Sequence, residues 1–219
     1  MSAIPLGRAA FIGEMAGLGV DVSRETIERL QALVDTLGRW QKSINLIGRG
    51  TVDDVWNRHV LDSAQLLPLI PRTAETLVDL GSGGGFPGLV IAALVPHLRV
   101  TLIEADARKA SFLAEAARRM GLERTAIIRI GRIEAVEPVK SDVVTARALA
   151  PLSQLLSWAA RHRGDTTICL FHKGKGWQSE LTEAMKSWDI SLQPSTSITH
   201  IDAVILRIGP FSLRGTGSA

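Results

Sequence analysis

The spacing of apolar residues along the chain changes once, near residue 75. Before that point it has the 3.6-residue period of helices. A helix is predicted to begin after Ser23, whose side chain can accept a hydrogen bond from a free N–H of the first turn. Its apolar stripe consists of Ile27, Leu30, Leu33, Val34 and Leu37. A loop at 45–50 and a second helix over 52–67, ended by Pro68 and Pro71, complete a predicted helical cap over 1–75.

After residue 75, short apolar runs of strand length alternate with helical stretches. Helices are predicted over 87–95, 107–120, 152–162 and 178–188. Strands are predicted over 77–80, 99–104, 126–130, 142–146, 166–172, 190–197 and 203–208. Such alternation predicts a mostly parallel sheet that is covered on both faces. The last two strands have no helix between them, which predicts one antiparallel strand at the edge of the sheet.

The predicted fold class is therefore α/β, with a seven-stranded, mostly parallel, Rossmann-like sheet over 76–209 and the helical cap in front of it. A polar tail over 210–219 is predicted to be flexible. At 219 residues the chain suits one large domain with an appendage.

Composition narrows the class of protein. Hydrophobic residues make up 46% and charged residues 21%, which is typical of a globular protein with a real core. The longest apolar run, 88–96, is too short to span a membrane, and the N-terminus lacks the apolar segment of a signal peptide. The single cysteine, Cys169, permits no intrachain disulfide, and no Cys/His cluster has metal-ligand spacing. We expect a cytoplasmic protein with neither a metal site nor a membrane partner.

The charge of the chain is slightly positive and unevenly distributed. The net charge is +3. Residues 1–75 carry 8 Lys and Arg against 9 Asp and Glu, whereas residues 76–219 carry 17 against 13. This small excess permits a nucleic-acid partner without requiring one.

A cluster of glycines follows the first predicted strand directly. Five of the eight residues in 81–88 are glycine, and a helix is predicted to begin at Pro87. Glycine lets a backbone turn tightly and approach a ligand closely, and the free N–H groups of the helix start face the same place. Glu104 lies about twenty residues further on, where a carboxylate can accept both hydroxyls of a ribose. The segment therefore predicts a loop that binds a nucleoside-containing cofactor.

The register of this loop favours S-adenosylmethionine over a dinucleotide. Residues 83–88 fit G-x-G-x-x-G, but the strand ends at Leu80 and the turn already begins at Gly81. Asp79, in front of the first glycine, would repel a pyrophosphate but suits a cofactor with a sulfonium and an ammonium group. No Gly-Lys-Ser/Thr follows, so a Walker phosphate loop is excluded. A dinucleotide-binding oxidoreductase and a small-molecule methyltransferase remain as alternatives.

Three segments together resemble one family. They are 39–46 (RWQKSINL), 58–63 (RHVLDS) and 79–88 (DLGSGGGFPG), and 108–113 and 146–148 extend the likeness. In order and spacing they resemble the bacterial small-subunit ribosomal RNA guanine-N7 methyltransferases, also called the glucose-inhibited division protein B family. The resemblance covers about 30–175, and the last forty residues are less distinctive. The turn has Gly84 and Phe86 where relatives often carry Pro and Leu, a difference that leaves the turn intact.

The resemblance implies a class I methyltransferase fold and a specific reaction. The expected activity is transfer of the methyl group of S-adenosylmethionine to N7 of one guanine, nucleotide 527 of 16S ribosomal RNA, within the 30S subunit. Cofactor contacts carried over by motif fall on Gly81, Phe86, Ile133, Glu134 and Arg147. The position of the loop and of the second strand adds Asp79, Gly83 and Glu104.

The remaining predicted contacts concern the RNA. Arg147 is expected to position the substrate, because its guanidinium can bind the guanine O6 or a phosphate. Since N7 already has an in-plane lone pair, no acid or base is required, and Cys169 is assigned to the core. We expect a monomer. The expected RNA-binding residues are Arg39, Lys42, Arg58 and His59 on the cap, and Lys173 and Lys175 after the fifth strand.

Overall fold

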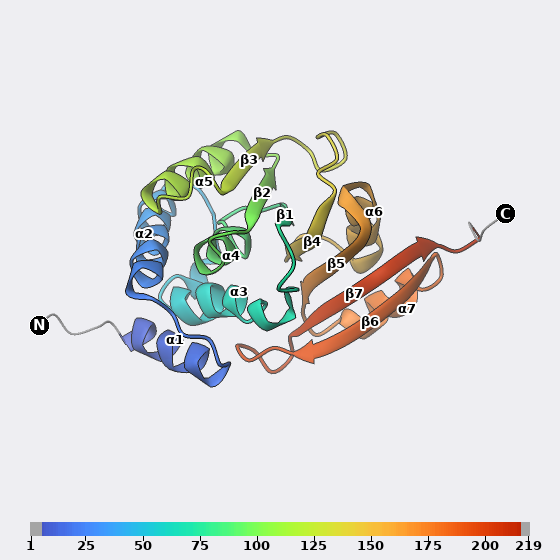
Figure 1. Ribbon diagram of the computed structural model, residues 1–219, viewed down its shortest axis with the longest axis horizontal. Helices are drawn as coiled ribbons and strands as arrows, with labels where there is room; N and C mark the ends of the chain where they lie inside the picture. Colours follow the sequence, from blue (N-terminus) through green and yellow to red (C-terminus); the bar gives the residue numbers. More distant parts are fainter. Residues whose placement is uncertain (1–5, 216–219) are drawn as a thin grey trace, which may run out of the picture.

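A computed structural model describes residues 6–215, and its seven strands form one sheet (Figure 1). The strands are β1 (Thr76–Leu80), β2 (Arg99–Glu104), β3 (Ala126–Ile130), β4 (Ser141–Arg147), β5 (Arg163–Lys173), β6 (Trp188–Thr196) and β7 (Val204–Leu213). Their spatial order is β3-β2-β1-β4-β5-β7-β6. The order reverses direction between β1 and β4, and in such sheets ligands bind beyond the carboxyl ends of the strands at that point.

The pairing is parallel from β3 to β5 and antiparallel beyond it. The prediction of a mostly parallel, seven-stranded sheet is confirmed. The predicted place of the antiparallel strand is wrong, because β7 lies between β5 and β6 and β6 forms the edge. The connection over residues 197–203 makes β6 and β7 a hairpin, and β7 is the strand that pairs with the body of the sheet.

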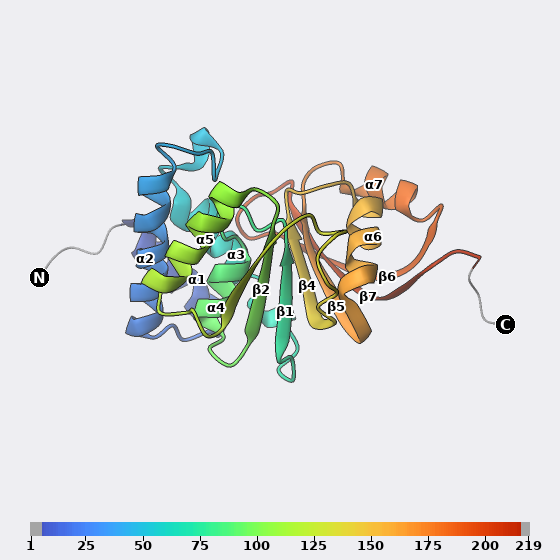
Figure 2. The same ribbon diagram turned by 90° about the horizontal axis from the view of Figure 1, so that it is seen from above.

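Helices cover both faces of the sheet (Figure 2). One face carries α1 (Leu6–Gly17), α2 (Arg24–Trp40), α3 (Asp62–Ala64), α4 (Gly88–Leu94) and α5 (Ala107–Arg119), and the other carries α6 (Leu152–His162) and α7 (Trp177–Ala184). Neighbouring residues of a strand point to opposite faces, so Leu77 joins the first core and Val78 the second. The cap helices share one hydrophobic cluster with α4, α5 and their face of the sheet.

The cap differs from its prediction in two places. The helix after Ser23 is confirmed, with the Ser23 Oγ accepting from the Thr26 N–H at 3.1 Å. The helix predicted over 52–67 is shorter and irregular: its π-helical part (Trp56–Leu61) runs directly into α3, and a separate 3₁₀ turn (Leu67–Leu69) follows. The sequence predicts a helical cap over 1–75 but no separate helix at α1, whose short segment combines glycines with bulky apolar residues.

Two boundaries near the C-terminus are also corrected. The helix predicted over 178–188 ends at Ala184, because Trp188 is buried at the start of β6 and packs against Phe211. The tail predicted from residue 210 is wrong for 210–213, which belong to β7, and 211–213 pair with β6. Residues 216–219 lie outside the described part of the chain.

Candidate active site

The glycine loop after β1 has a backbone that only glycine adopts readily. Gly81, Gly83 and Gly85 have φ values of +64°, +51° and +84°, in the left-handed region. A Cβ on Gly81 would lie 2.5 Å from Leu149 Cδ1, whereas at Gly83 no atom beyond its neighbours lies closer than the Gly81 O at 3.8 Å. Gly83 therefore needs its φ but faces open space, as expected where a ligand approaches the backbone.

Glu104 fastens this loop to the end of β2. Its Oε2 accepts a hydrogen bond from the Gly83 N–H at 2.8 Å, and its Oε1 accepts from the Asp106 N–H at 2.8 Å. The side chain is buried, with 8% exposed. Each carboxylate oxygen can accept a second hydrogen bond, so the group remains able to bind ribose hydroxyls.

The buried side chain of Asp79 binds the backbone at Gly88, the end of the glycine loop, and it does not line the cavity. Its Oδ2 accepts from the Gly88 N–H at 3.3 Å and its Oδ1 from the Thr145 hydroxyl at 2.8 Å, and the side chain is fully buried. Burial raises the pKa of this carboxyl to about 6, although hydrogen bonds from Thr145 and Ser82 oppose the rise. The prediction of a direct cofactor contact is corrected here, because residue 79 is the last position but one of a central strand and its side chain points under α4.

A cavity of about 740 Å³ opens beside the loop. Its volume is in the range of small-molecule and cofactor sites. It is lined by seven of the eight residues predicted to contact the cofactor: Gly81, Gly83, Phe86, Glu104, Ile133, Glu134 and Arg147. Residues from the cap, among them Arg58 and His59, form another part of its wall. The structure thus brings the predicted cofactor loop and part of the predicted RNA-binding wall to one place.

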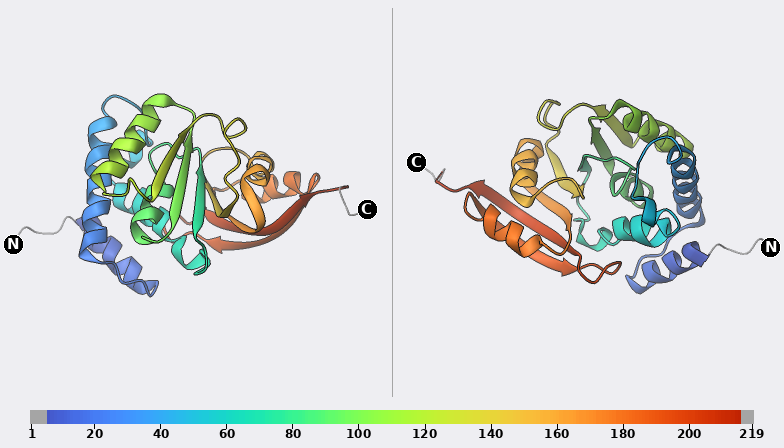
Figure 3. Two further views of the ribbon diagram at one scale, coloured as in Figure 1. Left: turned by 45° about the horizontal axis from the view of Figure 1, so that its top comes forward. Right: turned by 180° about the vertical axis from the view of Figure 1, so that it is seen from behind.

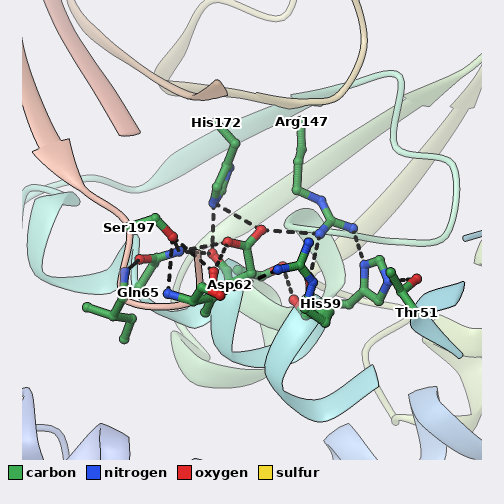
Figure 4. Close-up of polar contacts among 11 residues, drawn as sticks. Thr51, His59, Asp62, Gln65, Arg147, His172 and Ser197 are labelled. Carbon is green, nitrogen blue, oxygen red and sulfur yellow. Dashed lines mark hydrogen bonds and ion pairs between the residues drawn. The ribbon is translucent and has the colours of Figure 1, made fainter. Parts of the chain in front are cut away.

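Arg147, at the end of β4, is held by the cap (Figure 4). Its Nη1 donates to the Arg58 O and to Asp62 Oδ2, both at 3.2 Å, and its Nη2 donates to His59 Nδ1 at 2.8 Å. Its guanidinium carbon also lies 5.2 Å from the centre of the Phe86 ring. Three of the five N–H groups of Arg147 are therefore engaged within the chain.

The π-helical turn makes one of these contacts possible. In an α-helix the Arg58 O would accept from the N–H of Asp62. Here that N–H donates to the Asn57 O and the His59 O, and the Arg58 O accepts from Arg147. Such π-type turns are frequent at functional sites.

The charges of this cluster follow from its burial. Burial, helped by the positive charges of Arg147 and Arg58, lowers the pKa of His59 to about 4. The neutral ring accepts from Arg147 at Nδ1 and so donates from Nε2 to the Thr51 hydroxyl at 2.7 Å. For Asp62, burial alone would raise the pKa, but His172, the Thr199 hydroxyl and Arg147 together bring it below its ordinary value. The ionised carboxylate of Asp62 and the guanidinium of Arg147 thus lie next to each other in the cavity wall.

The tip of the β6–β7 hairpin closes the same cluster, beside α3 (Figure 3). The Thr199 hydroxyl donates to Asp62 Oδ1 at 2.6 Å, and the Ile198 N–H donates to Gln65 Oε1 at 2.9 Å. His172 Nε2, at the end of β5, donates to the Asp62 O at 2.7 Å. Asp62 therefore joins three segments that are far apart in the sequence.

The predicted RNA-binding residues have different surroundings. Arg58 and His59 line the cavity, but Arg39 and Lys42 are exposed near the end of α2 and do not line it. The ammonium of Lys173 is paired with Glu180 at 2.5 Å and is largely buried, so it is not free to meet a phosphate without breaking that pair. Lys175 is exposed and lines a neighbouring cavity of about 360 Å³.

Several site residues were not found from the sequence. Asp62 lies in the segment 58–63 that carries the family resemblance, but only Arg58 and His59 of that segment are predicted to bind RNA. His172 and Thr199 belong to no motif, and their part in the cluster depends on contacts over 110 and 137 positions of the chain. The only available signal was that the strand containing His172 ends at the ligand-binding edge.

The described residues 6–215 give little support for a cysteine nucleophile, a metal site or a membrane-spanning helix. Cys169 is buried in β5, and burial raises the pKa of its thiol to about 12, so it is no nucleophile. In this range no three His, Cys, Asp or Glu side chains gather as metal ligands. None of the described helices is long and apolar enough to cross a membrane.

Comparisons with solved structures agree with the fold. The chain resembles the cofactor-bound protein Rv0187 of MTB with a TM-score of 0.61 and 13% identity, covering 94% of this chain and 98% of that one. It resembles an O-methyltransferase of Bacillus cereus in complex with SAH with a TM-score of 0.54 and 12% identity, covering 92% and 97%. At these identities the likeness concerns the fold, which is that of class I methyltransferases.

Comparisons of sequence are more specific. The family model described as rRNA small subunit methyltransferase G, GidB, matches residues 26–207. A ribosomal RNA small subunit methyltransferase G of Paramagnetospirillum magneticum is 50% identical over 188 residues, which are 85% of this chain and 90% of the relative. Its counterpart in Cereibacter sphaeroides is 47% identical over 193 residues, covering 86% and 93%. This chain belongs to the GidB family of small-subunit ribosomal RNA methyltransferases.

Proposed function

We propose that the protein transfers the methyl group of S-adenosylmethionine to N7 of a guanine in 16S ribosomal RNA, nucleotide 527, within the 30S subunit. The observation that carries the proposal is the shared cavity: the glycine loop and Glu104 form one side, and the cap residues with Arg147 form the other. A cofactor and a base can therefore meet in one place. Work on ribosomal subunits would place the protein in the cytoplasm.

The residues on the cofactor side suit S-adenosylmethionine. The space above Gly83 is open, and the Glu104 carboxylate retains acceptors for the two ribose hydroxyls. Ile133, 7% exposed, offers an apolar surface to an adenine, and Glu134 lies beside it. When bound, the cofactor supplies an electrophilic methyl group on a sulfonium.

On the substrate side, the protein has to position the guanine, but it does not have to remove a proton from it. Guanine N7 carries its lone pair in the plane of the base, so the reaction needs alignment of N7 with the methyl carbon and sulfur. Arg147 keeps two N–H groups beyond the three engaged within the described chain, and these are available for guanine O6 or a phosphate. Asp62 offsets the charge of Arg147, which lowers the electrostatic cost of placing a sulfonium in the same cavity.

Binding of RNA is expected to involve cations around the cavity. Arg58, Lys109 and Arg132 line it, and the exposed Lys175 lies at the adjoining cavity. Arg39 and Lys42 would act as a more distant part of the docking surface. Since cations that bind phosphates release counterions, affinity for RNA should fall steeply as salt concentration rises. A flat salt dependence would contradict this part of the proposal.

The decisive experiment supplies labelled S-adenosylmethionine with three acceptors in parallel: 30S subunits that lack the modification, naked 16S RNA, and free GTP. Label in the 30S subunits or the naked RNA, mapped to N7 of nucleotide 527, supports the proposal and identifies the true substrate. Label in GTP alone would instead indicate a small-molecule methyltransferase. Absence of label from all three would refute the proposal.

A further inference from the structure

The tip of the β6–β7 hairpin, residues 197–203, forms part of the cavity wall and carries an exposed isoleucine, Ile201. We propose that the side chain of Ile201 enters the base stack of the RNA beside the target guanine and holds that base out of the stack. This inference rests on the proposed function, since it assigns a role in presenting the base to be methylated.

The tip is a firm support for such a side chain. Its two ends are joined by a hydrogen bond from the Ser197 N–H to the Ala203 O at 3.0 Å, and the Ala203 N–H donates to the His200 O at 3.0 Å. The Thr199 hydroxyl and the Ile198 N–H are bound to the cap at Asp62 and Gln65, and Figure 4 shows these contacts beside Ser197 and Gln65. A protruding loop with this many contacts to a distant segment is fixed in place.

The position of Ile201 relative to the cavity is specific. Thr199, His200 and Ala203, on both sides of it in the sequence, line the cavity, whereas Ile201 itself points into solvent and does not line it. The side chain of Ile201 is 90% exposed, a larger fraction than for any other exposed large apolar side chain in the described part of the chain. Ile198, on the same tip, is 46% exposed. The two exposed isoleucines of the tip are therefore next in sequence to residues of the wall that would receive the base.

RNA is the partner that fits these surroundings. Arg58 Nη1 lies 3.5 Å from the Thr199 O, so a cation lies next to the tip. Such a cation can bind a phosphate of an RNA strand that contacts the tip. A guanine in folded RNA is stacked, and enzymes that modify such a base must take it out of the stack. Aliphatic wedges, isoleucine among them, insert between base steps and stabilise the unstacked arrangement. An isoleucine on a fixed loop beside the cavity has the shape and chemistry of such a wedge.

The test measures kcat and KM on unmodified 30S subunits for the wild type, Ile201→Ser, Ile201→Leu and the control Ile127→Ser. Ile127 is a 45% exposed isoleucine on β3, at the other end of the sheet, and does not line the cavity. A wedge acts after docking, so Ile201→Ser should lower kcat about 10-fold or more with little change in KM. Ile201→Leu should retain most of the activity, and Ile127→Ser and the affinity for S-adenosylmethionine should be unchanged.

The same measurements also give the results that would overturn the proposal. A fall in kcat of less than about threefold overturns the wedge, whatever KM does, since a rise in KM alone indicates an ordinary docking contact to RNA or to a ribosomal protein. Equal losses in Ile201→Ser and Ile127→Ser also overturn it. A wild-type protein that methylates no acceptor would instead refute the proposed function, which separates the two failures.

Discussion

Replacing Asp79 by Asn should make the protein more stable at neutral pH. The carboxyl is fully buried, and burial raises its pKa from 3.8 to about 6. At about 1.4 kcal/mol per pH unit, the ionised form costs the folded chain about 3 kcal/mol at pH 7. An asparagine has the same shape, accepts from the Gly88 N–H through its oxygen, and donates through its amide to the Thr145 hydroxyl.

The sign of the pH dependence follows from the same numbers. The folded chain binds the Asp79 proton more tightly than the unfolded chain, so the stability contributed by this group is full below 3.8 and lost as pH rises through about 6. The advantage of Asp79→Asn should therefore be small at pH 4 and reach about 3 kcal/mol at pH 7. His59 has the opposite effect, because its lowered pKa of about 4 makes stability fall as pH drops from 6.5. Because His59 is present in both proteins, the difference in stability between the variant and the wild type reports the contribution of Asp79 alone.

The assay is urea unfolding of both proteins across this pH range, and the measured quantity is the difference between their free energies of unfolding. Thr145→Val is a useful control, because it removes one hydrogen bond to the carboxylate and should destabilise the wild type most at high pH. An Asp79→Asn protein that is less stable than the wild type at pH 8, or a difference that does not change with pH, would refute the reasoning. It would mean that the hydrogen bonds of the ionised carboxylate outweigh its loss of hydration.

Three further predictions concern the site and the core. Gly83→Val should strain a backbone at φ +51°, cost about 2 kcal/mol of stability, and weaken binding of S-adenosylmethionine at least about 10-fold by calorimetry; unchanged binding would contradict the role of the loop. Asp62→Ala leaves the buried Arg147 guanidinium without its carboxylate, so thermal unfolding should show a loss of about 3 kcal/mol together with reduced methylation, and full activity would show that Arg147 needs no such partner. The Cys169 thiol should not react with a thiol reagent at pH 8 until urea unfolds the chain, and rapid reaction of the native protein would disprove its burial.

The sheet could be predicted well because its signal is local. β2, β3 and α6 have the predicted bounds, since each is an uninterrupted apolar or amphipathic run bounded by polar or turn residues. The gathering of the residues that are predicted to bind the cofactor could be predicted in the same way, because loops that follow consecutive strands of a parallel sheet meet at one edge. Seven of these eight residues line the cavity, and Asp79 was misplaced because strand alternation turns its side chain beneath the loop.

The cap and the substrate side could not be predicted in the same way. The segment 52–67 has a helical period, but its π-helical turn is stabilised by contacts such as that of the Arg58 O with Arg147, 89 positions away. Lys173 shows that the surroundings of a charged side chain are equally hard to predict from the sequence. A lysine beside glycines at the end of a strand predicts an open cation, yet Glu180 of α7 folds back to neutralise it.

The position of β7 between β5 and β6 also constrains the order in which the molecule can assemble. β6 is synthesised first, but within the described sheet it pairs only with β7, so it has no place in the sheet until the later strand has joined β5. The contact of the hairpin tip with Asp62 closes a loop of 137 residues. Contacts that close long loops form late, because their entropic cost is met only once the rest of the chain is ordered. A growing chain could thus complete the glycine loop while the side of the cavity formed by the hairpin tip is still missing.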